Sequence, residues 1–334
     1  MKSPVFKPDQ REAQSRFFSQ IDPANLMEGY PYRLIERARS LNLNPVFSED
    51  IEQHFAGDAV RNGSTIVWHQ HCNHALSSQV CCVNFLAPLM RQPELLSRVL
   101  ASALGVEPPE MQPVGTDAKG RDLFVDFEWT GESDYLGEWP KGKIASRGAN
   151  ATSADAAVRY RDSSGLCTVL IEWKYTESYG ARIPDSANPE GGNRIRVKRY
   201  QDKTFEPDGP IRSDLGLKVE DFFWEPFYQL MRQQMLAWRM QQARESGADR
   251  VMVLHISPNG NLALHKVTAP NLQRFGSDAF EVFSGLLVEP GNFRSTSIEA
   301  AFLPTLQKAV VDGLGREWAT YLLERYTFLR DHDQ

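Results

Sequence analysis

The stretch that decides the fold is ANATSADAAVRYRDSSGLCTVLIEWKYTESY, residues Ala149–Tyr179. It predicts two strands joined by a tight turn, because Asp-Ser-Ser-Gly at Asp162–Gly165 consists of residues that turns favour. The segment SADAAVRYR precedes the turn, and CTVLIEWKY, rich in β-branched and aromatic residues, follows it. The second strand is apolar on both faces, which is typical of a strand inside a sheet.

Three charged residues interrupt this apolar hairpin. Glu172 and Lys174 are two residues apart, so they share one face of the second strand, and Asp155 lies on the first strand. Burying such groups is costly unless they pair with one another or bind a metal. Their presence in a buried sheet therefore predicts a functional site.

Asp155, followed after sixteen residues by Glu172-Trp173-Lys174, resembles the signature of the PD-(D/E)XK nuclease superfamily. The Asp falls on one hairpin strand and the Glu-x-Lys on the next, as that family requires. Ala154 stands where the motif has proline, and this departure does not affect the residues that carry the chemistry. The helix start Ser77–Gln79 is similar to that of the restriction-endonuclease-like branch of this superfamily. The alternative is a hairpin whose Asp, Glu and Lys only pair with one another.

The elements predicted around the hairpin follow the order helix, strand, strand, strand, helix, strand. The first helix starts near Ser77, a strand covers 122–132, a long helix covers 224–247 and an apolar strand covers 250–256. This order matches the nuclease family. The resemblance thus implies an α/β, restriction-endonuclease-like core over residues 71–257, with a central mixed sheet flanked by helices.

The rest of the chain is predicted to extend this core. Residues 1–70 read as a helical N-terminal extension packed on the core, with helix-like spacing at 11–20 and 32–41. Residues 180–221 read as a polar linker. Residues 258–334 are predicted to add the short strand NLALHKV (261–267) and two amphipathic helices to the same domain.

Two further elements offer side chains to the site. The strand 122–132 alternates, so Asp126 and Glu128 are expected on one face, and Glu128 is a candidate third carboxylate or a solvated residue. On the long helix, Gln229 and Gln233 share a face and are candidates for supporting the site. The residues expected on the opposite strand face are Val125, Phe127 and Trp129, and those expected in the apolar stripe of the helix are Phe227, Met231, Met235 and Trp238.

A basic segment follows the hairpin. Five of the ten residues from Arg194 to Lys203 are basic, Tyr200 lies among them, and Asp202 is the only acid. Such a segment can bind phosphates electrostatically, although a solvated loop has the same composition. The bases are Arg194, Arg196, Lys198, Arg199 and Lys203.

Two other patterns carry less weight. The histidine-rich region fits no usual zinc-ligand spacing, so a polar approach to a helix is favoured over a zinc site. The Walker-like run from Gly137 to Lys143 is interpreted as chance, because Ile144 replaces the required Ser or Thr. The residues of the histidine-rich region are His54, His69, His71, Cys72 and His74.

Composition limits the function classes. A net charge of −6 and a pI of about 5.7 argue against a general DNA-coating protein, which would be basic. The chain has no apolar run long enough to span a membrane, and its first residues lack the apolar core of a signal peptide. These features and four cysteines without framework spacing predict a cytoplasmic protein without disulfides or a membrane partner.

The resemblance implies a metal-dependent nuclease. In it, Asp155 and Glu172 bind Mg²⁺, for which Mn²⁺ can substitute, and the carbonyl of Trp173 completes the ligand shell. Lys174 positions or deprotonates the attacking water, or neutralises the phosphate. Glu128 binds a second ion or orients the first ligands.

The implied substrate is nucleic acid, with DNA favoured over RNA and endonuclease over exonuclease activity. The alternative function is a nucleic-acid-binding or scaffold protein of the same fold that does not cleave. A homodimer is left open.

Overall fold

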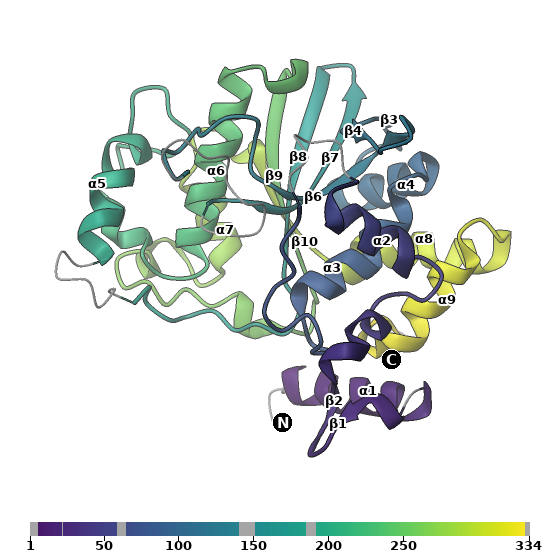
Figure 1. The fold of residues 1–334 in the computed structure, drawn as a ribbon. Helices are drawn as coiled ribbons and strands as arrows, with labels where there is room; N and C mark the ends of the chain where they lie inside the picture. Colours follow the sequence, from purple (N-terminus) through teal and green to yellow (C-terminus); the bar gives the residue numbers. More distant parts are fainter. Residues whose placement is uncertain (1–5, 22, 59–64, 140–150, 185–191, 331–334) are drawn as a thin grey trace.

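The computed structural model describes residues 6–21, 23–58, 65–139, 151–184 and 192–330. It has a central mixed β-sheet with helices on both faces (Figure 1). The predicted mixed α/β architecture is confirmed. The strands are β1 (Leu26–Met27), β2 (Tyr30–Leu34), β3 (Glu110–Gln112), β4 (Gly115–Thr116), β5 (Asp122–Leu123), β6 (Val125–Trp129), β7 (Ala154–Asp162), β8 (Gly165–Trp173), β9 (Arg250–Ser257) and β10 (Phe293–Ser297).

The main sheet has the order β10-β9-β8-β7-β3, and β6 also pairs with β7. Strands β8, β9 and β10 run parallel, whereas β7 is antiparallel to β8, β6 and β3. The α-helices are α1 (Phe6–Ile21), α2 (Ser48–Gln53), α3 (Ser78–Leu86), α4 (Pro93–Leu104), α5 (Gly192–Thr204), α6 (Phe227–Gln242), α7 (Ala279–Gly285), α8 (Ile298–Asp312) and α9 (Arg316–Arg325).

The predicted hairpin forms β7 and β8 at the centre of the sheet. Asp162 pairs with Gly165 across the turn, and the Asp162 carboxylate accepts a 2.7 Å hydrogen bond from the N–H of Ser164. Gly165 has φ +115°, and a Cβ there would lie 2.4 Å from the Asp249 carboxylate, so glycine is required. Every residue of β8 after Gly165 is buried, as expected for an interior strand.

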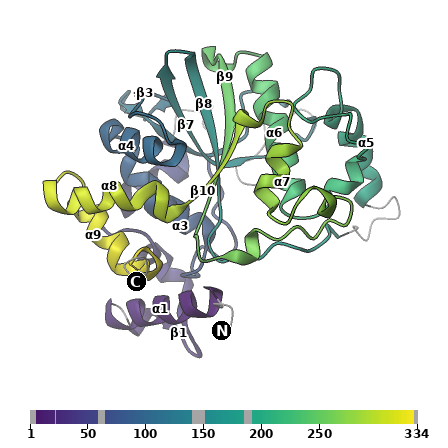
Figure 2. The ribbon, with the colours of Figure 1, turned by 180° about the vertical axis from the view of Figure 1, so that it is seen from behind.

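Two helical layers cover the sheet (Figures 1 and 2). Helices α3, α4, α8 and α9 lie on one side, and α5, α6 and α7 lie on the other. Alternate residues of β8 accordingly divide between two cores: Val169 and Ile171 face the α3 side, whereas Leu170 faces the α6 side. Helix α3 begins as predicted, with the Ser77 hydroxyl accepting from the N–H of Val80.

Three predicted segments differ from the structure. Residues 32–41 form β2 and a 3-10 helix, because the backbone of this segment pairs with residues 73–75: the N–H of Leu34 donates to the carbonyl of Asn73. The strand predicted at 261–267 is a loop with a 3-10 turn, and β10 occupies the edge beside β9 instead. The predicted linker 180–221 contains helix α5.

The alternation predicted for residues 122–132 is also wrong. Phe127 packs in the core on the α3 side and Trp129 in the core on the α6 side, although a regular strand would point them to the same face. Between them Glu128 has φ +50°, a left-handed conformation that interrupts the pleat. In α6, Phe227, Met231 and Met235 are buried as predicted, but Trp238 is only half-buried and lies outside the core.

Among the described residues, no helix is both long and apolar enough to cross a membrane. Lys143 and the rest of the Walker-like run after Trp139 lie outside the described residues. The boundaries predicted for the core, at residues 70 and 257, stay predictions.

Candidate active site

The register of the sheet aligns one polar residue from each of five strands. The β6–β7 and β7–β8 pairings, continued by one residue beyond Phe127 and Ala156, place Glu128 opposite Asp155 and Asp155 opposite Glu172. Glu172 in turn pairs with His255, and His255 pairs with Ser295. We call this set the polar row. Its members are Glu128, Asp155, Glu172, His255 and Ser295.

The centre of the polar row faces helix α6. Ala157, Leu170 and Val253 belong to the core on the α6 side, and each lies two residues from a member of the row on its own strand. By alternation, Asp155 and Glu172 share that face with His255. The sheet therefore brings the two predicted carboxylates together at the end of β8.

Lys174 is the cation of the site. Its ammonium contacts Glu172 Oε1, and 12% of its side chain is exposed against 1% for Glu172. Burial alone would lower the pKa of Lys174, but the Glu172 carboxylate outweighs that effect and raises the pKa well above its usual value. Lys174 is therefore an ammonium at neutral pH.

The Asp155 carboxylate lies in an electrostatically unfavourable place. Burial first, and then repulsion from Glu172, raises the pKa of Asp155 well above its usual value, despite the opposing effect of Lys174. One oxygen, Oδ2, accepts a 2.6 Å hydrogen bond from the N–H of Trp173. This bond ties the Asp to the strand that carries Glu172 and Lys174.

Gln233 reaches the site from α6. Its Nε2 donates to Glu172 Oε2 and, at 3.2 Å, to the carbonyl of Ser153. Gln229 lies one turn earlier, and its backbone N–H donates to the Glu225 carboxylate. The two glutamines share a helix face as predicted, and Gln233 is the one whose amide holds Glu172.

At least three neighbours hold the Glu128 carboxylate. Gln79 Nε2 donates to Oε1 at 2.8 Å, Ser153 Oγ donates to Oε2 at 3.1 Å, and His69 Nε2 lies 3.3 Å from Oε1. Its left-handed backbone turns this carboxylate towards α3. The same helix contributes Ser78, whose Oγ donates to the Trp173 carbonyl at 3.2 Å. Helix α3 therefore contacts both Glu128 and the Glu-x-Lys segment.

The donor set suits a hard cation bound by few protein ligands. Among the described residues, no group of three or more His, Cys, Asp or Glu side chains is placed to hold a metal ion. Mg²⁺, however, typically uses one or two carboxylates and takes its other ligands from water and phosphate. Asp155 and Glu172 meet that requirement, and their mutual repulsion is the kind that a cation relieves.

Sequence reasoning missed His255. It is fully buried, its Nδ1 lies 3.0 Å from Ser295 Oγ, and its ring stacks on Phe280 with centroids 4.0 Å apart. Burial, and then the nearby charge of Lys174, lowers its pKa well below the usual value. A polar residue in the apolar run RVMVLHI was the available signal, but only the register reveals that His255 neighbours Glu172.

Two further charged residues near the site were also missed. Burial raises the pKa of Glu225, and Arg232 and Lys174 act against this shift. Arg232 Nη1 donates to Thr152 Oγ1 at 3.1 Å, and its guanidinium lies 4.6 Å from the centre of the Tyr228 ring. Glu225 precedes α6 and Arg232 lies in its N-terminal half, so the long helix contributes more than its glutamines.

The predicted basic segment forms helix α5, which divides its charges. Arg194 and Lys198 are one turn apart and exposed on one face, and Arg199 lies on another. Arg196 donates to the carbonyl of Pro184 at 2.8 Å. Tyr200 is buried and donates to Glu138, so its ring does not stand among the bases as an exposed surface.

The histidine-rich region is divided as well. His54 is buried with its Nε2 3.1 Å from Asp126, His69 contacts Glu128, and His74 Nδ1 accepts from the N–H of Leu76. Burial, and then Arg33, lowers the pKa of His74 to about 4. These separate partners agree with the interpretation of the region as a polar approach to α3.

Replacing His255 with Asn is expected to reduce the amount of stability that the protein loses between pH 7.5 and pH 5.5. In the wild type, His255 stays neutral in the folded state while it is protonated in the unfolded chain below about pH 6.5, so its stability contribution is present above that pH and lost as pH falls. The loss reaches at most about 1.4 kcal/mol per pH unit. Urea unfolding at pH 7.5 and 5.5 measures it, with exposed His71→Asn as the control. If the unfolding free energies of the wild type and of His255→Asn depended equally on pH, the inference that His255 stays neutral in the folded state would be wrong.

A mixed sheet between helical layers, with two acids and a lysine gathered at the open end of its central hairpin, is the architecture expected of a restriction-endonuclease-like α/β protein. Comparison with family models gives the same class. The chain belongs to the family described as Restriction Endonuclease associating with ARP, which matches residues 12–327. No curated protein and no solved structure matches the chain significantly.

Proposed function

We propose that this protein is a PD-(D/E)XK nuclease that hydrolyses DNA in a metal-dependent reaction, as an endonuclease rather than an exonuclease. The observation that supports this most is the cluster of Asp155, Glu172 and Lys174 at the end of the β7–β8 hairpin away from its turn, in which Glu172 is fully buried. Membership of a restriction endonuclease family makes a nuclease the expected class.

Each residue of the cluster has a role in the proposal. Asp155 and Glu172 would hold Mg²⁺ or Mn²⁺, together with the Trp173 carbonyl, and a bound ion would stabilise the charge that develops on the phosphate. Lys174 orients the attacking water or neutralises the phosphate. In the metal-free site the Glu172 carboxylate raises the pKa of Lys174, which favours a cationic role over that of a base.

The surrounding side chains position these groups. The three contacts of Glu128 favour an orienting role over that of a ligand for a second ion. Gln233 fixes one oxygen of Glu172, which limits the rotation of that carboxylate.

The test is incubation of the pure protein with labelled DNA and RNA, single- and double-stranded, linear and circular, with Mg²⁺, Mn²⁺ or EDTA. We expect cleavage of DNA, including circular DNA, only with a metal. Asp155→Asn is the matched control against contaminating nucleases. Cleavage that is equal in wild type and this variant would overturn the proposal.

One observation favours the alternative function. Glu172 is engaged by both Lys174 and Gln233, so the cluster satisfies itself in part without an ion. A nucleic-acid-binding protein that does not cleave would therefore bind DNA equally well with or without Mg²⁺ and would leave it intact. Calorimetric titration with Mg²⁺ beside the cleavage assay separates the two functions.

Helix α5 is proposed to contact the DNA backbone. Replacing Arg194 and Lys198 with Gln is expected to weaken DNA binding and to reduce the slope of log affinity against log salt by roughly 2, about 0.9 for each lost phosphate contact. The measurement is fluorescence anisotropy at several salt concentrations. Lys308→Gln with Arg316→Gln is the control, because α8 and α9 lie on the far side of the sheet from α5 (Figure 1). An unchanged slope would mean that this face of α5 is only solvated.

A further inference from the structure

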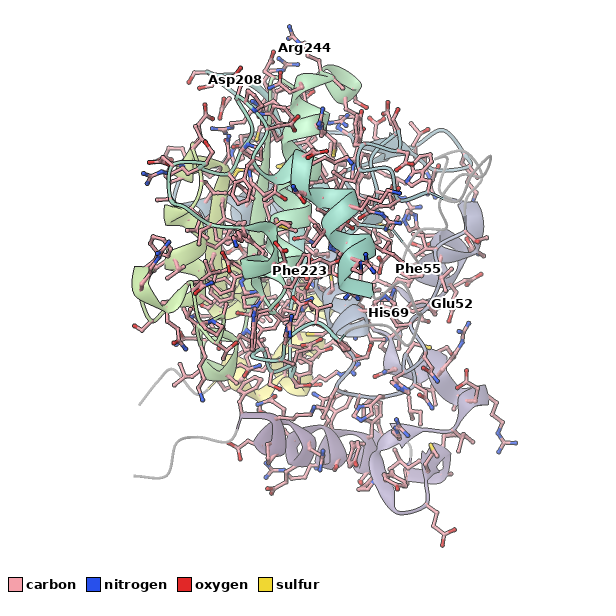
Figure 3. The ribbon with its side chains drawn as sticks, turned by 90° about the vertical axis from the view of Figure 1, so that its left-hand side faces the viewer. Glu52, Phe55, His69, Asp208, Phe223 and Arg244 are labelled. Carbon is pink, nitrogen blue, oxygen red and sulfur yellow. The ribbon has the colours of Figure 1, made fainter. Side chains whose placement is uncertain are left out.

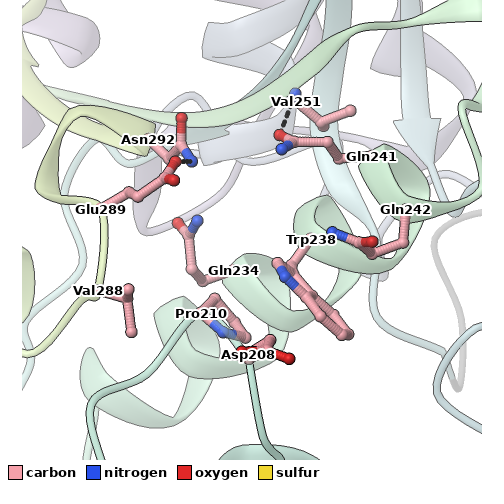
Figure 4. A pocket seen from close by; sticks show the side chains of 11 residues that line it. Asp208, Pro210, Gln234, Trp238, Gln241, Gln242, Val251, Val288, Glu289 and Asn292 are labelled. Carbon is pink, nitrogen blue, oxygen red and sulfur yellow. Dashed lines mark hydrogen bonds between the residues drawn. The ribbon is translucent and has the colours of Figure 1, made fainter.

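A second site lies on the same helix, α6, but away from the polar row. It is a cavity of about 140 Å³ between the C-terminal half of α6, the loop at Asp208–Pro210, the start of β9 and the segment Val288–Asn292 (Figure 4). Val251, which lines it, precedes His255 of the polar row by four residues, or roughly 13 Å of strand. Figure 3 likewise shows Asp208 near one end of the molecule and His69, the neighbour of Glu128, well away from it.

Two side chains of α6 mark this cavity as a binding site. Trp238, which sequence periodicity assigns to the core, is half-buried and forms one wall. Gln234 is 2% exposed, and its amide turns into the cavity (Figure 4). Its Oε1 is buried and has no hydrogen-bond partner among the described residues. A buried amide oxygen without a donor is costly, and a ligand that supplies an N–H would remove that cost.

The cavity is rich in acceptors and negative charge. The carboxylates of Asp208 and Glu289 line it together with the unpaired oxygen of Gln234. The nearby cation Arg239 is held 2.7 Å from Glu206 and lies over the Trp238 ring. A phosphate would therefore be repelled, whereas a cation with several N–H donors would be attracted.

The size of the cavity suits a small flat group. An engineered cavity of about 150 Å³ in another protein holds one benzene molecule. A guanidinium group is planar, carries five N–H donors and is attracted both by carboxylates and by an indole ring. A lysine ammonium is compact and strongly hydrated, and it does not fill such a space as a plane.

We propose that this cavity binds a guanidinium group, presented either by a free arginine-like compound or by an arginine side chain of another protein. The Gln234 amide oxygen and the Asp208 and Glu289 carboxylates accept its N–H groups, and the indole of Trp238 packs beside it. The proposal is independent of the nuclease function, because no residue of the polar row takes part.

The experiment is calorimetric titration of the full chain with N-acetyl-L-arginine amide, with N-acetyl-L-lysine amide and deoxyadenosine as comparison ligands. We expect the arginine derivative to bind at least tenfold more tightly than either. Gln234→Met should weaken its binding about tenfold, since a hydrogen bond to a charged donor is lost. Gln229→Met, the same change on the same helix outside the cavity, should leave it unaltered.

Two exposed variants keep the test decisive if Gln234→Met does not fold. Asp208→Asn and Glu289→Gln should each weaken binding of the arginine derivative severalfold at low salt and less at high salt. A pentapeptide with a central arginine distinguishes the sources: tighter binding of the peptide supports a protein ligand, and equal binding supports a small molecule. No saturation by either arginine probe, or tighter binding of deoxyadenosine, overturns the proposal.

Discussion

Asp155→Asn and Glu172→Gln are each expected to reduce single-turnover DNA cleavage by roughly 10³-fold. A metal ion contributes several kcal/mol of charge stabilisation in phosphoryl chemistry, and each 1.36 kcal/mol corresponds to a tenfold change in rate. Removing one of the two proposed carboxylate ligands should forfeit most of that contribution. The exposed carboxylate Asp312, replaced by Asn, is the control, and its variant should cleave at the wild-type rate.

The Asp155→Asn variant should also be more stable than the wild type without metal. The folded-state pKa of Asp155 is raised, so its favourable contribution is complete below the unfolded-state pKa of about 3.9 and is lost as pH rises through the folded-state pKa. At pH 8, far above the unfolded-state pKa, the raised pKa means that Asp155 contributes unfavourably to folding, and Asn removes the ionisable group while its carbonyl can still accept from Trp173. We expect the melting temperature at pH 8 to rise by roughly 2 °C, with no gain at pH 4.

These two measurements together decide the assignment of Asp155. Full cleavage activity in Asp155→Asn would remove it from the catalytic site. Reduced activity combined with a lower melting temperature at pH 8 would mean that the carboxylate stabilises the fold, contrary to the electrostatic argument. EDTA should abolish cleavage by the wild type and leave the melting temperature of Asp155→Asn unchanged.

Lys174→Ala is expected to lower the cleavage rate by roughly 10²- to 10³-fold, the loss seen when a preorganised group that stabilises transition-state charge is removed. DNA affinity should change little, because a residue that acts in the transition state contributes mainly to the rate. The variant should also unfold more easily, by about 3–5 kcal/mol, because Glu172 is left buried without its cation.

The contributions of Lys174 to stability and to catalysis can be separated by replacing it with arginine. Lys174→Arg keeps the charge beside Glu172 and should recover much of the lost stability, but its planar fork differs from a compact ammonium and should restore little of the rate. Single-turnover cleavage below the melting temperature of each variant is the measurement. Lys308→Ala, which breaks an exposed lysine–carboxylate pair, is the control. Wild-type cleavage by a destabilised Lys174→Ala would assign Lys174 a purely structural role.

The sequence predicted the elements whose signals are local. The Asp162–Gly165 turn, the apolar strand β8 and the stripe of Phe227, Met231 and Met235 each follow from residues close together in the chain. The order of the core elements matches the nuclease family that the chain resembles, and that resemblance implied a mixed α/β sheet. Asp155, Glu172 and Lys174 could be grouped because a hairpin brings nearby residues together.

The features that sequence reasoning missed depend on distant contacts or on backbone conformation. His255 neighbours Glu172 only through a parallel strand that follows a long excursion of the chain. The left-handed backbone of Glu128, whose side chain is held by Gln79 of α3, puts Phe127 and Trp129 on opposite faces of the sheet. Tertiary packing of this kind overrides the local periodicity on which the prediction rested.

The polar row has a consequence for how the chain folds. A slip of one residue between two strands turns every side chain of the displaced strand to its other face. If β7 slipped against β8, Asp155 would enter the apolar core on the α3 side, away from Lys174, and its charge would be buried without compensation. Misaligned pairings are thus penalised by the same charges that form the site. Because misalignment of the central hairpin is energetically unfavourable, we expect few trapped folding intermediates in the wild type. The neutral variant Asp155→Asn lacks this penalty and should populate more trapped intermediates during refolding.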